Sequence, residues 1–330
     1  MKFGKYLAGR LIAWFLVIFI GMTLMWVIPR FFPADPVESM IQSMLSKTSL
    51  QAEVVESMRI QLRSQYGLEG TLWEQYCDFW ARAIHLDFGP SLANFPTSAT
   101  SLVMRYMPYT VGMALFTTIC AWTIGNAIGL IVGFRKDKKS STVIEYIVMC
   151  MYPIPYFILA LVIQVMFCFI WKIFPVTATI VTGQGAAAYW SSVIRSSTLP
   201  ALTMLVLGFG WWVISMKAMA QNTAEEEFVR YARYRGMTER HIMMKYVLRN
   251  SIIPQVNGLA ISLGGVFGGA LMAEIIFQYP GVGKLVQRAI MQADYNMIMA
   301  TVSISIIAVA TATLVADLIY PLIDPRIRFS

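Results

Sequence analysis

The sequence predicts an all-α membrane protein with six transmembrane helices and a small external helical subdomain. Of its 330 residues, 57% are hydrophobic and 13% are charged, whereas a soluble domain is about 45–50% apolar and about 25% charged. Six stretches are apolar over about the 20 residues that a membrane-spanning helix needs. The basic residues gather on alternate loops, which is typical of a multi-pass membrane protein.

The six predicted spans are residues 11–29, 106–134, 143–171, 198–220, 252–277 and 297–321. The first follows Lys2, Lys5 and Arg10, as a secretory signal would. Its apolar run is long, however, and it ends at Ile28-Pro29-Arg30 without a small-residue cleavage site. We therefore expect this segment to be retained as a helix.

The distribution of Lys and Arg predicts that both termini are cytoplasmic. We count 16 of the 26 basic residues on the side that holds the termini and the loops after the second and fourth spans. Cytoplasmic loops collect basic residues in this way. The net charge of +8 therefore has an explanation in membrane topology, and we expect no nucleic-acid partner.

The segment between the first two spans, residues 30–105, is too long for a turn and too polar to cross a membrane. Its stretches 50–66 and 72–84 have helical character, and a run rich in Pro, Gly and Ser follows them. We predict three parts of the chain: a transmembrane helix (1–29), an external subdomain (30–105) and a five-helix core (106–330). The loop 172–197 is also expected to face outward, with a short interfacial or re-entrant helix.

Aromatic residues in the second helical stretch have the spacing of one helix face. Trp73, Tyr76, Phe79 and Trp80 are sufficient to anchor this helix on the membrane surface or on the rest of the protein. The other hypothesis is that the subdomain forms an outer vestibule where an external partner docks.

The sequence offers no cofactor, metal or catalytic site. Its four cysteines lack a CxxC spacing, and the two histidines, His85 and His241, lie far apart. The string GVGK at 281–284 is similar to part of a phosphate loop, but Gln278 replaces the first Gly and Leu285 replaces the Ser or Thr. No charged residue is predicted at the middle of a span, which argues against a proton- or sodium-coupled carrier.

Small residues and prolines mark three of the predicted spans. Gly125, Gly129 and Gly133 recur every four residues in the second span, a pattern that lets helices approach closely. For these we predict packing within the chain. The fifth span carries Gly264, Gly265, Gly268 and Gly269, with Glu274 near its outer end. We expect this glycine cluster to face a partner subunit, a narrow path or another helix, and we expect Pro153 and Pro155 to kink the third span.

A basic segment, EEEFVRYARYRGMTERHIMMKYVLRNSIIP (225–254), separates the fourth and fifth spans. Helix formers run up to Gly236, which tolerates the left-handed turn that ends a helix. Thr238 can cap a second helix. We predict a rigid helix–turn–helix through which a soluble motor can push on the membrane subunit. The alternative is a charged loop that only fixes topology.

Several motifs, in order along nearly the whole chain, carry a resemblance to a known family. VRYARYRGMTERHIMMKYVLRNSIIP resembles the cytoplasmic EAA-type loop of ABC importer permeases of the oligopeptide/dipeptide class. GGVFGGALMAEIIFQYPGVGKLVQRAIMQADY, ADLIYPLIDPRIR and the opening RLIAWFLVIFIGMTLMWVIPRFFPADPVE resemble further signatures of that class. The loop departs from its consensus, because Arg230-Tyr231-Ala232 stand in the place of Glu-Ala-Ala.

The resemblance implies a non-catalytic subunit of a type I ABC importer in a bacterial or archaeal cytoplasmic membrane. Its implied partners are a second homologous permease, two cytoplasmic ABC ATPases, an extracellular or periplasmic solute-binding protein and membrane lipid. The implied substrate is an oligopeptide, with an oligosaccharide or another small solute as the alternative. A stand-alone secondary carrier or channel is the alternative from a different class.

The resemblance also implies a coupling loop at 222–251, with a short helix at about 238–245 that inserts into a groove of one ATPase. The implied coupling residues are Ala232, Arg235, Gly236, Thr238, Glu239, Arg240, His241 and Lys245. The residues expected at the translocation path or in helix packing are Gly264, Gly265, Gly268, Gly269 and Glu274.

Overall fold

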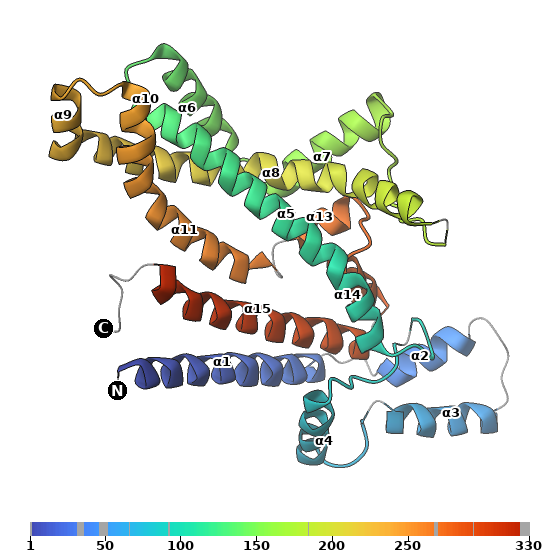
Figure 1. Cartoon of the computed structure of the whole chain (residues 1–330). Helices are drawn as coiled ribbons and strands as arrows, with labels where there is room; N and C mark the ends of the chain where they lie inside the picture. Colours follow the sequence, from blue (N-terminus) through green and yellow to red (C-terminus); the bar gives the residue numbers. More distant parts are fainter. Residues whose placement is uncertain are drawn as a thin grey trace. The chain divides into compact units, whose positions relative to one another are not determined.

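The computed structural model describes residues 2–31, 36–45, 52–65, 67–91, 93–183, 185–266, 270–292 and 294–323. Over these residues the regular secondary structure is helical, apart from one isolated bridge between Pro90 and Ser98. The prediction of an all-α protein is confirmed (Figure 1). The chain forms two compact units, one of residues 1–110 with 280–311 and one of residues 111–279 with 312–330.

The first unit holds the N-terminal helix and the segment that follows it. Its helices are α1 (Lys2–Val27), α2 (Pro36–Leu45), α3 (Ala52–Gln65), α4 (Leu72–Ile84), the start of α5 (Ala99–Phe134), α14 (Val282–Met291) and most of α15 (Tyr295–Ile323). A short 3-10 turn, Ile28–Phe31, follows α1. The helix predicted over 72–84 has the bounds of α4, and the stretch 50–66 corresponds to α3.

Local sequence fixes where α4 begins. The Glu74 amide donates to Thr71 Oγ1 over 3.3 Å, and the Thr71 amide donates to Glu74 Oε2 over 2.7 Å. This reciprocal capping box satisfies two amides that the first helical turn leaves without partners.

The core of the first unit joins α4 to α1. Buried Met22 and Trp26 of α1 pack with Phe79 and Ala83 of α4 and with Val103 of α5. Aromatic residues of the predicted face contribute to this packing, because the ring centroids of Trp26 and Tyr76 lie 5.1 Å apart. The structure thus shows that α4 is anchored on the protein itself.

The second unit contains the remaining helices. They are α6 (Lys139–Met151), α7 (Tyr156–Gln164), α8 (Ala186–Glu225), α9 (Glu227–Tyr234), α10 (Glu239–Ile242), α11 (Leu248–Gly264) and α13 (Leu271–Ile276), together with most of α5 and the end of α15. Two π-helical segments, Val165–Ile170 and Met243–Val247, follow α7 and α10. The helix pair 139–151 and 156–170 is bent by 97°, so the kink predicted at Pro153 and Pro155 is confirmed.

The described residues support four spans, or five if the bent pair is one span. Four helices are long and apolar enough to cross a membrane: Gly4–Val27, Ala99–Phe134, Ala186–Glu225 and Tyr295–Ile319. The predicted count of six is not confirmed. The fifth predicted span, 252–277, is divided, because α11 ends at Gly264 and α13 begins at Leu271.

The expectation of a separate short helix within 172–197 is wrong. Residues 186–197 form the first turns of α8, a single helix of 40 residues. Pro200 lies inside this helix without ending it. The predicted span 198–220 is therefore the middle of a longer helix.

The glycines of α5 pack against α8. A Cβ atom on Gly129 would lie 2.6 Å from the carbonyl oxygen of Val213, and one on Gly133 would lie 2.5 Å from that of Lys217. Real Cβ atoms do not approach so closely, so only glycine allows this helix contact. The prediction that Gly125, Gly129 and Gly133 pack within the chain is confirmed.

The glycines at the end of α11 have other surroundings. A Cβ on Gly264 would lie 3.0 Å from Thr313 Oγ1 of α15, whereas the nearest atom to one on Gly265 is Ser262 O at 3.6 Å, an ordinary contact. Within this chain Gly264 therefore lies close to α15, whereas the described residues leave only an ordinary contact at Gly265. The expectation that the glycine cluster faces a partner subunit or a translocation path stays a prediction. Gly268 and Gly269 lie outside the described residues.

Candidate functional site

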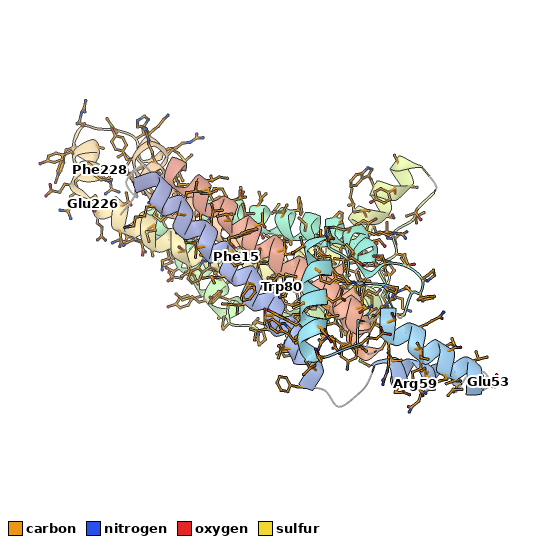
Figure 2. The ribbon with its side chains drawn as sticks, turned by 90° about the horizontal axis from the view of Figure 1, so that it is seen from below. Phe15, Glu53, Arg59, Trp80, Glu226 and Phe228 are labelled. Atoms are coloured by element: carbon orange, nitrogen blue, oxygen red, sulfur yellow. The ribbon has the colours of Figure 1, made fainter. Side chains whose placement is uncertain are left out.

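The candidate site is the segment 222–251, which connects α8 to α11. Glu226, with extended backbone angles, separates α8 from α9, and Figure 2 labels it with Phe228 at this junction. Gly236 has a φ of +72°. Its amide donates to Arg233 O over 2.9 Å, and the Met237 amide donates to Ala232 O over 3.3 Å. This pair of bonds is the Schellman motif, so the prediction that Gly236 ends the helix by a left-handed turn is confirmed.

The second helix of the segment differs from the expectation. Thr238 lies at the N-cap position of α10, but within the described residues its side chain makes no capping hydrogen bond. The predicted side-chain cap is therefore wrong. The turn is already closed by backbone bonds at Gly236, and the carbonyl of Thr238 accepts from the Ile242 amide over 3.0 Å. The predicted short helix 238–245 is also not separate, since α10 continues through the π-helical segment Met243–Val247 into α11.

One face of the segment is buried against α5 and α8. Val229, Ala232, Ile242 and Val247 are almost fully buried, and they pack with Leu130, Met216 and Ala220. A buried aliphatic side chain of this size contributes about 1.5–3 kcal/mol. The segment is therefore a packed element, which supports the rigid helix–turn–helix over the alternative of a charged loop.

The other face is exposed and carries most of the residues that the sequence assigned to coupling. The exposed members are Arg235, Gly236, Thr238, Glu239, Arg240, His241 and Lys245. Ala232 differs from them, because it belongs to the buried support. The Arg233 guanidinium pairs with Glu239 across the turn, with 3.1 Å between Nε and Oε1, so α9 and α10 are tied together on their outer side.

Sequence reasoning missed two aromatic residues of this face. Tyr231 is 63% exposed and Tyr234 is 84% exposed. They occur three residues apart on α9, away from Val229 and Ala232, and this spacing was the signal that could have found them. Exposed aromatic side chains are enriched in protein interfaces, so this face has the chemistry of a docking surface.

A further ion pair lies where α5 and α8 end. Lys136 Nζ is 2.7 Å from Glu225 Oε1, and this hydrogen bond raises the pKa of Lys136. Because both side chains are half or more exposed, water and salt screen the attraction between them. The pair is a minor tie beside the buried core.

Buried polar groups connect three helices of the second unit. Trp122 Nε1 of α5 donates to the carbonyl of Gln255 over 2.9 Å, and Gln255 Nε2 donates to Ser215 Oγ of α8 over 2.9 Å. A buried amide requires such partners. No pattern in the sequence indicated this set of hydrogen bonds. Glu274, predicted near the outer end of a span, is fully buried in α13.

These features define a class of protein, a multi-pass helical membrane subunit with a packed basic segment between two of its helices. In the part of the chain that is described, no group of three or more His, Cys, Asp or Glu side chains could hold a metal ion. Residues 125–329 match the family of binding-protein-dependent transport system inner membrane components, and the chain belongs to that family.

Curated relatives cover almost the whole chain. It is 27% identical over 313 residues to the oligopeptide transport system permease protein AppB of Bacillus subtilis (strain 168), with 94% of this chain and 96% of that protein covered. It is 26% identical to the glutathione transport system permease protein GsiC of Shigella flexneri serotype 5b (strain 8401), with 98% and 99% covered. The Escherichia coli (strain K12) protein of the same name is 25% identical over the same coverage. The chain is a permease subunit of an ABC importer, and the resemblance found in its sequence is confirmed.

Proposed function

We propose that the chain forms half of the translocation path of an ATP-driven importer for oligopeptides. Relatives that cover nearly its full length are named for oligopeptide and glutathione transport, and both solutes are peptides. The proposed partners are a second homologous permease, two cytoplasmic ABC ATPases and a solute-binding protein. Import of an oligosaccharide or another small solute by the same machinery is the second candidate.

The observation that carries the coupling role is the two-faced packing of segment 222–251. Its buried face joins α5 and α8, and its exposed face presents Tyr231 and Tyr234 beside basic residues. A groove on one ATPase receives α9 and α10. Because the buried face is continuous with the core of the second unit, a displacement of the ATPase moves α5 and α8 with it.

The docking role is tested with the double variant Tyr231→Ala/Tyr234→Ala in the complete importer. Two interface aromatics together contribute about 2 kcal/mol or more, so we expect a loss in ATPase affinity of about thirtyfold or more. Tyr146→Ala is the matched control, because Tyr146 of α6 is 64% exposed and lies outside the segment. Unchanged ATPase assembly in the double variant would show that Tyr231 and Tyr234 do not form the docking surface for the ATPase.

The transport role is tested in proteoliposomes. Solute uptake should require ATP, both ATPase subunits and the binding protein, and it should persist without an ion gradient. Uptake by the chain alone, driven by an ion gradient, is the result expected for the stand-alone carrier. A ligand screen on the purified binding protein then decides between peptide and oligosaccharide.

We propose that both termini and segment 222–251 are cytoplasmic. In a background without native cysteines, Lys138→Cys and Thr238→Cys should resist an impermeant thiol reagent in intact cells, and Glu69→Cys should react. All three positions are exposed on the protein surface, so protection reflects the membrane. Strong labelling of Lys138→Cys in sealed cells would reverse the topology.

A further inference from the structure

The apolar side chains of α4 form an arc around the helix, and the rest of the protein covers only one part of this apolar arc. Phe79 and Ala83 are buried, and Tyr76 and Trp80 at the edge of the same face are half-buried. Next to them lie Trp73, Cys77 and Ile84, which stand on one stripe because successive helical residues are about 100° apart. Trp73 is 71% exposed, Ile84 is 74% exposed and Cys77 is exposed. The opposite side of the helix is polar, with Glu74, Asp78 and Arg82.

The position of α4 along α1 is fixed by specific contacts. The ring of Trp80 stacks on Phe19 with centroids 5.3 Å apart, and Tyr76 Oη lies 2.9 Å from Thr23 Oγ1. Figure 2 shows α4 crossing α1, with Trp80 labelled. Phe19 is eight residues before Val27, the end of α1, which is about 12 Å along the helix axis. The contacts therefore lie within about 12 Å of the C-terminal end of the candidate span Gly4–Val27.

The start of α5 also indicates that the contact between α4 and α1 lies at a membrane interface. Tyr106 packs against the cluster that contains Trp26, Tyr76 and Trp80, while its neighbour Arg105 is exposed. Aromatic rings and exposed basic residues gather at the level of lipid headgroups.

The surface of α1 that continues from α4 is apolar. Phe15 stacks with Phe19, with centroids 6.0 Å apart, and Phe19 stacks with Trp80. This row of rings leads from the exposed side of α1 to Trp80, which neighbours the stripe on α4, and Figure 2 labels its two ends, Phe15 and Trp80. Ile20 and Leu24 of α1 are also exposed. An exposed apolar surface of α1 thus leads to the part of α4 that carries the exposed stripe.

We propose that the stripe Trp73, Cys77 and Ile84 of α4 lies in the membrane interface, at the boundary of the phospholipid headgroups and acyl chains. The protein covers one part of the apolar arc, lipid covers the next part, and the charged side faces water. In this arrangement α4 is an interfacial anchor that sets the height of α2 and α3 above the membrane. The proposal requires only that α1 spans the membrane, so it is independent of the substrate and of the coupling segment.

The test uses the native cysteine of the stripe. Cys120, Cys150 and Cys168 are replaced by Ala, and Cys77 is labelled with an environment-sensitive fluorophore in the complete importer in phosphatidylcholine vesicles. The matched control is Asp78→Cys in a Cys77→Ala background, one residue further along the same helix on its polar side. A second control is Glu69→Cys in the exposed turn before α4.

An amphipathic helix in the interface is buried by about 5–10 Å. Doxyl-labelled phosphatidylcholine should therefore quench the Cys77 label at least about threefold more than the Asp78→Cys label, and aqueous iodide should quench the controls and spare Cys77. Iodide quenching at Cys77 equal to that of the controls would show that the stripe faces water. Protection of Cys77 from both quenchers would show that a protein subunit covers it. Either result overturns the proposal.

Discussion

The glycines of α5 and those at the end of α11 share a four-residue spacing, but their neighbours differ. A Cβ atom on Gly125, Gly129 or Gly133 would meet α8 at 2.5–2.6 Å. At Gly264 the nearest atom is a Thr313 hydroxyl at 3.0 Å, and at Gly265 it is a carbonyl of the same helix at 3.6 Å. The glycines of α5 form a tight contact with α8, whereas of the two described glycines at the end of α11 only Gly264 has a close neighbour, on α15.

The difference shows what a small-residue pattern can predict. The spacing makes close approach possible, but the opposing helix decides whether it occurs. In lipid there is little hydrophobic force between helices, so van der Waals contact at such places carries much of the packing. On α8, the backbones of Val213 and Lys217 face α5 directly, and the glycines are needed for that reason.

The largest effect is expected for Gly129→Ala. The added methyl group would collide with the Val213 carbonyl and with Met216 Cβ at 2.8 Å, and a backbone atom cannot rotate away. We expect a loss toward the upper end of the about 1–3 kcal/mol that overpacking costs, measured by reversible unfolding in detergent. Gly112→Ala on the same helix is the control, because nothing in the described part of the chain lies within 4 Å of its Cβ position. Equal stability of both variants would break the contrast between the two regions.

Gly236→Ala tests a position where glycine is required for its backbone conformation and not for the space around it. No atom of the described residues lies within 4 Å of its Cβ position, but its φ is +72°. An L-residue in this conformation costs about 1–2 kcal/mol. We expect the turn of segment 222–251 to loosen, with a partial loss of uptake per ATP hydrolysed.

The control for this position is Gly236→Asn, because Asn tolerates the left-handed region. It should retain more coupling than the Ala variant. If Ala and Asn behave alike, the left-handed turn has no part in coupling.

Local features of the fold could be predicted from the sequence. Gly236 ended a helix because a residue without Cβ costs little at positive φ. The prolines at 153 and 155 bent a span because they cannot continue the hydrogen-bond ladder. Each of these signals acts over a few residues, so one sequence is sufficient to read it.

Features that depend on distant residues could not be predicted. Gln255 Nε2 donates to Ser215 of another helix, and nothing in the local pattern identifies that partner. The exposure of Tyr231 and Tyr234 follows from which side of α9 packs on α5 and α8. Similarly, the sequence could not show that Gly264 lies close to another helix and Gly265 does not, because this difference depends on the position of Thr313 of α15.

The smallest effect on chain stability is expected for Gly265→Ala. Its φ is −81°, which any residue adopts, and its Cβ position has only an ordinary contact. The change should stay within about 0.5 kcal/mol, whereas Gly264→Ala should cost more, because the hydroxyl of Thr313 must rotate away from a Cβ at 3.0 Å. Unfolding of both variants in detergent measures the difference.

Gly265→Leu in the complete importer then sharpens the comparison, because among the described residues the Cβ position of Gly265 meets only an ordinary contact. If Gly265 faces the second permease or the translocation path, the leucine should reduce assembly or uptake while the chain itself keeps its unfolding midpoint. A Gly265→Leu variant with normal assembly and uptake would assign this glycine to a surface that tolerates bulk. In that case, only Gly264 of the described pair would have a packing role, and the glycines of α5 would remain the ones that a close helix contact requires.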